Sequence, residues 1–123
     1  MKFTYTTQIE ANIVTLKLEG DIIATYQFEE ILTMLPEWIA DGKIYFVIDL
    51  SKVRVMTSTG LTLLLTILTK SRNAGGDVVL ANISTPLSKL LLVTKLNSIF
   101  TTLASVEEAK THIATLMPKV LKP

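Results

Sequence analysis

A short hydroxyl-rich segment, Thr57 to Thr59, offers the sequence's best candidates for chemistry. Before it, residues 43–50 form a nearly unbroken apolar run rich in β-branched and aromatic side chains, which is typical of a strand buried on both faces. After it, residues 61–68 carry six apolar side chains interrupted only by threonines, which favours a helix. The hydroxyls therefore stand at a strand-to-helix junction and mark the start of the helix.

Two kinds of chemistry suit a hydroxyl in that place. It can cap the helix by accepting a hydrogen bond from an N–H group that the first turn leaves free, which stabilises a helix by about 1 kcal/mol. It can also accept a phosphoryl group, because a helix N-terminus presents free N–H groups and a partial positive charge. One residue can serve in both ways.

The rest of the sequence holds few groups for catalysis. It has no cysteine and one histidine, His112, which the helical pattern places on the last helix. Asp49 has no carboxylate or histidine companion at a useful spacing, so we interpret it as a strand-end acid that pairs with backbone or solvent. Metal binding and acid–base catalysis need several such groups. We therefore expect no enzymatic activity, no metal and no other cofactor.

Composition narrows the range of partners. The chain has 123 residues, enough for one domain with a core of its own, and its formal net charge is +1. Such a small charge does not favour binding to nucleic acid or to an anionic membrane. Although 49% of the residues are hydrophobic, no apolar run is long enough to span a membrane, and the amino terminus lacks a signal-peptide pattern. We expect a cytoplasmic protein without direct membrane insertion, with an apolar docking face.

Apolar periodicity predicts five strands and four helices, with strands near residues 3–9, 14–18, 43–50, 77–81 and 99–101 and helices over 28–39, 58–73, 85–91 and 106–116. This order predicts an α/β fold with a mixed, mostly parallel sheet of four or five strands and about four helices. The first two strands form a hairpin and supply the antiparallel pair. We expect a single domain over residues 1–123, with a frayed tail at 118–123.

Several residues predict where helices and strands begin or end. The Gly20-Asp21 pair ends the second strand, and Pro36 should kink the first helix or restart it. Ser84 or Thr85 caps the third helix. A capping box opens the last one, in which a serine reaches forward and a glutamate reaches back, at Ser105 and Glu108.

Taken in order, three segments resemble the STAS family, the domain of anti-sigma-factor antagonists and of sulphate-transporter tails: Val47-Ile48-Asp49-Leu50, Ser58-Thr59-Gly60-Leu61 and residues 75–83. Gly20-Asp21 matches the family's turn after the second strand, and the resemblance extends to residue 109, nearly the whole chain.

The resemblance implies a phosphorylation switch. In the family's antagonists, the serine at the position of Ser58 is phosphorylated by a kinase that is itself the anti-sigma factor. The unmodified antagonist binds that kinase, and a serine phosphatase restores this state. The implied docking face comprises Gly20, Asp21 and residues 57–60, namely Thr57, Ser58, Thr59 and Gly60. A homodimer is left open.

The sequence departs from the family pattern at three positions. Thr57 replaces the acid that precedes the serine, Ile23 replaces a second acid after Gly20-Asp21, and Lys95 replaces a glycine that often ends the third helix. The loss of the acid at position 57 and the apolar composition favour an alternative. In that alternative the domain is a STAS scaffold without a switch, or the cytoplasmic subunit of a membrane transport assembly. At position 95 we expect a helix end made differently.

Overall fold

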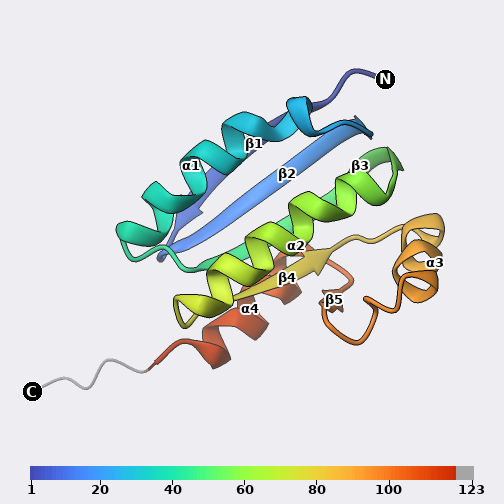
Figure 1. Ribbon diagram of the computed structural model, residues 1–123. Coiled ribbons are helices and arrows are strands. Elements are labelled where there is room, and N and C mark those ends of the chain that lie inside the picture. The colour runs from blue at the N-terminus through green and yellow to red at the C-terminus, as the bar shows by residue number, and fades with distance from the viewer. Residues whose placement is uncertain (119–123) are drawn as a thin grey trace, which may run out of the picture.

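The protein is described by a computed structural model that covers residues 1–118, and it is built on one five-stranded sheet (Figure 1). The strand order is β1-β2-β3-β4-β5; β1 pairs antiparallel with β2, and all other pairs are parallel. This mixed sheet confirms the predicted fold class. The strands are β1 (Thr4–Glu10), β2 (Ile13–Ile22), β3 (Tyr45–Met56), β4 (Asp77–Ala81) and β5 (Thr101–Leu103).

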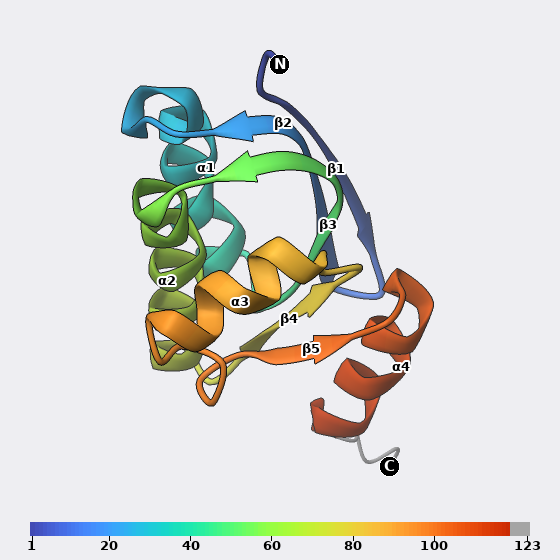
Figure 2. The same ribbon diagram turned by 90° about the vertical axis from the view of Figure 1, so that its right-hand side faces the viewer.

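Four helices cover the sheet, as the periodicity predicted. Figure 2 shows α1 and α2 on one face of the sheet and α4 on the other. A 3₁₀ turn, η1, leads into α1, and α3 follows β4. The bounds are η1 (Thr25–Phe28), α1 (Glu29–Ala40), α2 (Ser58–Asn73), α3 (Thr85–Val93) and α4 (Val106–Leu116). None of these helices is long and apolar enough to cross a membrane.

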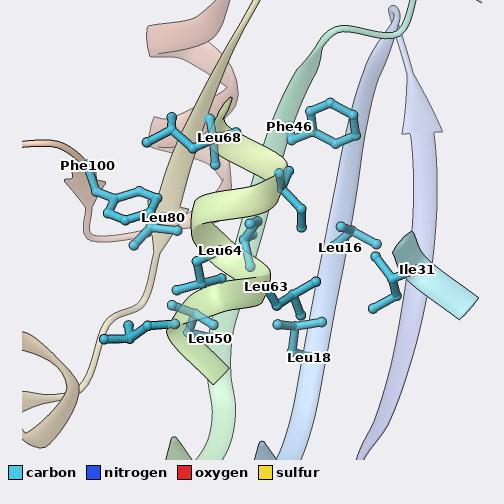
Figure 3. Close-up of a cluster of buried hydrophobic side chains, with 14 of the residues drawn as sticks. Leu16, Leu18, Ile31, Phe46, Leu50, Leu63, Leu64, Leu68, Leu80 and Phe100 are labelled. Atoms are coloured by element: carbon cyan, nitrogen blue, oxygen red, sulfur yellow. The ribbon is translucent and has the colours of Figure 1, made fainter. Parts of the chain in front are cut away.

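The strands bury both faces because their side chains alternate. Phe46 and Ile48 belong to the larger core, which α1, α2 and α3 share, whereas Tyr45 and Val47 belong to a smaller core under α4. Figure 3 shows Leu63, Leu64 and Leu68 of α2 packed against side chains of the central strands. Helix α2 buries seven residues, whereas α4 buries only Ala109 and Ile113. The position of α2, and thus of its first residue, is therefore firmly set by packing.

Two strands run further than predicted. The Gly20-Asp21 pair does not end β2, which continues to Ile22, and β3 continues past residue 50 to Met56. The extensions pair with each other, with Asp21 opposite Val55, across two shifts in register. Alternation is lost at these shifts, and for that reason the pattern hid the extensions. The last strand, β5, begins at residue 101 rather than 99.

The ends of the helices follow the predictions in part. Ser84 caps α3 by accepting a hydrogen bond from the Leu87 N–H at 3.3 Å. Ser105 likewise accepts from the Glu108 N–H at 3.1 Å, while the Glu108 carboxylate accepts from the Ser105 hydroxyl at 3.4 Å. Pro36 neither ends nor restarts α1, which is one continuous helix. The tail predicted at 118–123 lies, beyond Pro118, outside the described residues.

The expectation of a different end for α3 was wrong. Lys95 itself adopts the left-handed conformation, with φ of +63°, that glycine usually supplies. The Leu96 N–H then bonds to the Leu91 carbonyl at 2.8 Å, and the Lys95 N–H bonds to the Leu92 carbonyl at 3.0 Å. The usual helix-ending geometry is therefore kept, with a lysine in a backbone conformation that disfavours side chains.

Candidate functional site

The ends of β2 and β3 position the hydroxyl segment. The Thr57 N–H donates to the Ile22 carbonyl at 3.2 Å, so the start of α2 is tied to the end of β2. A Cβ on Gly60 would lie 2.9 Å from that same carbonyl oxygen and 2.7 Å from Met56 Cγ. Only a glycine lets α2 approach β2 this closely. Gly60 thus serves to place the segment, and it is itself buried.

The three hydroxyl residues differ in accessibility. Ser58 is the first residue of α2 and is exposed, whereas Thr57 and Thr59 are half-buried. Thr57 is the residue before the helix, but its Oγ1 atom is buried without a hydrogen-bond partner and does not cap α2. Capping was therefore the wrong interpretation of this position. Unlike α3 and α4, α2 begins with no side-chain cap.

The electrostatics of this helix end suit an anion. No acidic side chain lies in the first turn of α2, and the last turn carries Lys70 and Arg72. The first-turn N–H groups and the helix dipole therefore act on Ser58 without a carboxylate in the same turn. A negative group on the Ser58 oxygen would be stabilised there.

Gly20 and Asp21 lie beside this segment but are occupied within the chain. Gly20 is buried, with φ of +94°, and a Cβ there would lie 2.2 Å from the Lys2 carbonyl oxygen. The Asp21 carboxylate accepts two hydrogen bonds from Arg54, from Nε at 2.9 Å and Nη2 at 2.6 Å, and one from the Met1 amino group at 2.6 Å. These residues fasten the amino-terminal segment and β3 to β2.

The Asp21–Arg54 pair also changes the acidity of both groups. The hydrogen bonds from Arg54 and from the Met1 amino group lower the pKa of Asp21, and the Asp21 carboxylate raises the pKa of Arg54. Arg54 was not found from the sequence, because it lies in the part of β3 that the pattern did not reveal. Its only sequence signal was a cation in the segment between the strand and the hydroxyls.

Exposed apolar side chains lie at the ends of β2 and β3 and in η1, next to the elements that hold the segment, as the replacement at Ile23 indicated. Ile23 is 50% exposed, Tyr26 is 74% exposed and Val55 is 37% exposed. Beside them, a cavity of about 210 Å³ is lined by the end of β3 and the start of α3, including Arg54 and Ser84. We name the α2-start face the set formed by the exposed residues Ile23, Tyr26, Val55 and Ser58 together with the half-buried Asp21. Tyr26 and Val55 were not predicted, because their positions follow from η1 and the β3 extension.

Asp49 stays outside this face. It is 8% exposed, and its Oδ1 accepts hydrogen bonds from the Ser51 N–H and from Asn82 Nδ2, each at 3.0 Å. Burial raises the pKa of Asp49, but these hydrogen bonds outweigh it, so that the pKa lies below its ordinary value. The expected pairing of Asp49 with the backbone is confirmed, but its expected place at a strand end was wrong, because β3 continues to Met56. Among residues 1–118, no group of three or more histidine, cysteine or acidic residues could hold a metal ion.

Comparison with known proteins matches a family model, the STAS domain, to residues 4–109. The chain belongs to the STAS domain family. Its fold is similar to that of the anti-sigma factor antagonist SpoIIAA in its unphosphorylated form, with TM-score 0.78, 19% identity, and coverage of 94% of this chain and 100% of that chain.

Two further solved structures have a similar fold. Phosphorylated SpoIIAA, a Bacillus cell fate determinant, gives TM-score 0.72 at 20% identity and covers 89% of this chain and 99% of its own. A sulfate transporter family protein from Wolinella succinogenes gives TM-score 0.74 at 14% identity and covers 89% of this chain and 90% of its own. An anti-sigma factor antagonist and a sulfate transporter family protein are therefore both similar in fold to this chain.

Proposed function

We propose that this STAS domain is a binding module of the anti-sigma-factor antagonist type. The α2-start face, together with Thr57 and Thr59, docks an anti-sigma factor kinase when Ser58 is unmodified. Phosphorylation of Ser58 releases that partner, and a serine phosphatase reverses the step, in the cytoplasm. The observation that supports this proposal most is an exposed serine at the start of α2, a helix whose first turn has no side-chain cap and no acidic residue. Gly20 and Gly60 are buried and hold the face in shape.

The physics of the switch follows from charge. A phosphoserine adds about −1.5 to −2 charges. Within the free domain this charge meets the amino end of α2, which favours it. Within a docked complex the same charge would be buried, which costs several kcal/mol without a matching cation. Because about 1.4 kcal/mol changes affinity tenfold, the modification empties the complex without unfolding the domain.

A second candidate is a STAS subunit without a switch, in a larger or membrane-associated transport assembly. Thr57 supports it, since the residue before the serine has lost the acid of the family pattern and its hydroxyl is buried. The exposed apolar side chains Ile23, Tyr26 and Val55 suit a permanent interface as well as a reversible one.

Intact mass after incubation with ATP and a cognate anti-sigma factor kinase tests the switch. We expect a gain of one phosphate, about 80 Da, that is absent in Ser58→Ala and retained in Thr59→Ala. Binding to the kinase should be lost with the gain in mass. Retention of the gain in Ser58→Ala would refute Ser58 as the acceptor.

The same experiment separates the two candidates. If a kinase or ATPase stays bound through phosphorylation, or binds without ever modifying Ser58, the switch is refuted. The second candidate, a permanent subunit, is then supported. Substitution of Tyr26, which is 74% exposed, by serine should weaken docking in either case. Leu92→Ser is a matched control, because Leu92 is 62% exposed on α3 and does not belong to the α2-start face.

A further inference from the structure

The strand β1 is an open edge of the sheet. It pairs only with β2, and Figure 2 shows it as the outermost strand. All seven of its residues are exposed except Tyr5, which is half-buried. Its outer row of backbone N–H and C=O groups can therefore pair with another strand.

This edge lacks the usual protection against pairing. Within β1 there is no lysine and no proline, and its one charged residue is Glu10 at the end. The register between β1 and β2 runs without a bulge, so that the strand is not bent away. The opposite edge is protected by its shortness, since β5 has only three residues.

The sequence of β1 is complementary to itself. When two copies pair antiparallel with full overlap, Thr7 faces its own copy at the two-fold axis. Tyr5 then lies opposite Ile9, which is an aromatic–β-branched pair of the kind that stabilises sheets. Both residues are on the α1 face, because their partners in β2, Leu18 and Val14, belong to the larger core.

The polar residues match as well. In the same register, Thr6 lies opposite Gln8 and Thr4 lies opposite Glu10, so no like charges face each other. Ile9, which is 45% exposed in one copy, would be covered by the Tyr5 ring of the other.

We propose that two copies of this chain associate through β1 and form a continuous ten-stranded sheet about a two-fold axis at Thr7. This inference is independent of the proposed switch, because β2 separates β1 from the strand that leads into Ser58.

The test is a pair of charge variants at the axis. Thr7 is exposed, and Thr7→Lys or Thr7→Asp places like charges opposite each other only in the dimer. By light scattering over a concentration series, we expect the wild type to reach twice the chain mass and each variant to dissociate, with a dissociation constant raised about tenfold or more. An equimolar mixture of the two variants should recover the dimer, because lysine then faces aspartate.

A control variant tests whether dissociation depends on the β1 contact. Thr102→Lys on the opposite edge, β5, should leave the dimer intact, since Thr102 is exposed and lies outside the proposed contact. A wild type that stays monomeric at every concentration would overturn the proposal and would leave the edge for another partner. A dimer that survives both variants, or one that the mixture does not restore, would also overturn it.

Discussion

Some residues of this STAS domain adopt a left-handed backbone conformation that is unfavourable for a residue with a Cβ. Lys95 is the clearest case. It holds φ of +63° so that α3 can end with two hydrogen bonds to its last turn. A left-handed conformation costs a residue with a Cβ about 1 kcal/mol, whereas glycine adopts it freely. The hydrogen bonds of the helix end and the buried side chains of α3 outweigh that cost.

Lys95→Gly should therefore stabilise the domain by about 1 kcal/mol, as measured by urea unfolding. The matched control is Lys89→Gly, at an exposed position inside α3, which should destabilise by about the same amount. If both variants destabilise alike, the left-handed conformation at Lys95 carries no strain.

Asp49 should make stability depend on pH in the acid range. Its pKa is lowered in the folded state, so its contribution is complete above the unfolded pKa and is lost as pH falls through the folded one. Asp49→Asn removes the charge that strengthens the bonds from Ser51 and Asn82 and should cost about 1 kcal/mol at pH 7. The difference from wild type should shrink towards zero in acid.

The measurement is urea unfolding of both proteins at a series of pH values from 7 downwards. Glu37→Gln is the control, because Glu37 is exposed, lies outside the first turn of α1 and has no hydrogen bond to Asp49. A cost of Asp49→Asn that stays constant with pH would mean that packing, and not charge, accounts for it.

At the scale of elements, helix α2 starts where β2 and β3 end, and it does so without a cap. Thr57→Val replaces a buried hydroxyl that has no partner by a methyl group of similar shape. The variant should be at least as stable as wild type, and more stable by about 1 kcal/mol where the desolvation cost is fully relieved.

Ser105→Ala provides the contrast, because Ser105 caps α4 through the Glu108 N–H. Its loss should cost about 1 kcal/mol in thermal or urea unfolding. If Thr57→Val lowers the free energy of unfolding as much as Ser105→Ala does, then Thr57 caps α2 in solution and the capping interpretation of the sequence is correct.

The whole molecule has two unequal cores. The larger one joins α1, α2 and α3 to the sheet, while α4 buries only Ala109 and Ile113 in the smaller one. We expect amides of α4 to exchange hydrogen about tenfold or more faster than those of α2 and β3, because less apolar surface holds α4 in place.

Truncating one residue in each core tests this asymmetry. Ile113→Ala should speed exchange in α4 and leave α2 nearly unchanged. Ile67→Ala, in the larger core, should cost about 2–5 kcal/mol and speed exchange throughout. Equal effects of both variants on all elements would mean that the two cores open as one unit.

The sequence alone determined the element order, the mixed sheet and the position of the hydroxyl segment. These depend on local signals, namely apolar periodicity, serines at helix starts and the strand-to-helix junction before Ser58. They also sufficed for the family and for the pairing of Asp49 with the backbone, although not for its place within β3.

Only the tertiary structure decided how the segment is built and what surrounds it. Pairing of the ends of β2 and β3 brought Arg54 to Asp21 and left Val55 exposed. The close approach of α2 to Ile22 left the Thr57 hydroxyl buried without a hydrogen-bond partner. Each of these facts joins residues more than thirty positions apart. Local sequence patterns do not predict such pairing, because strand register and the distance of a helix from the strands are set by the packing of the whole sheet.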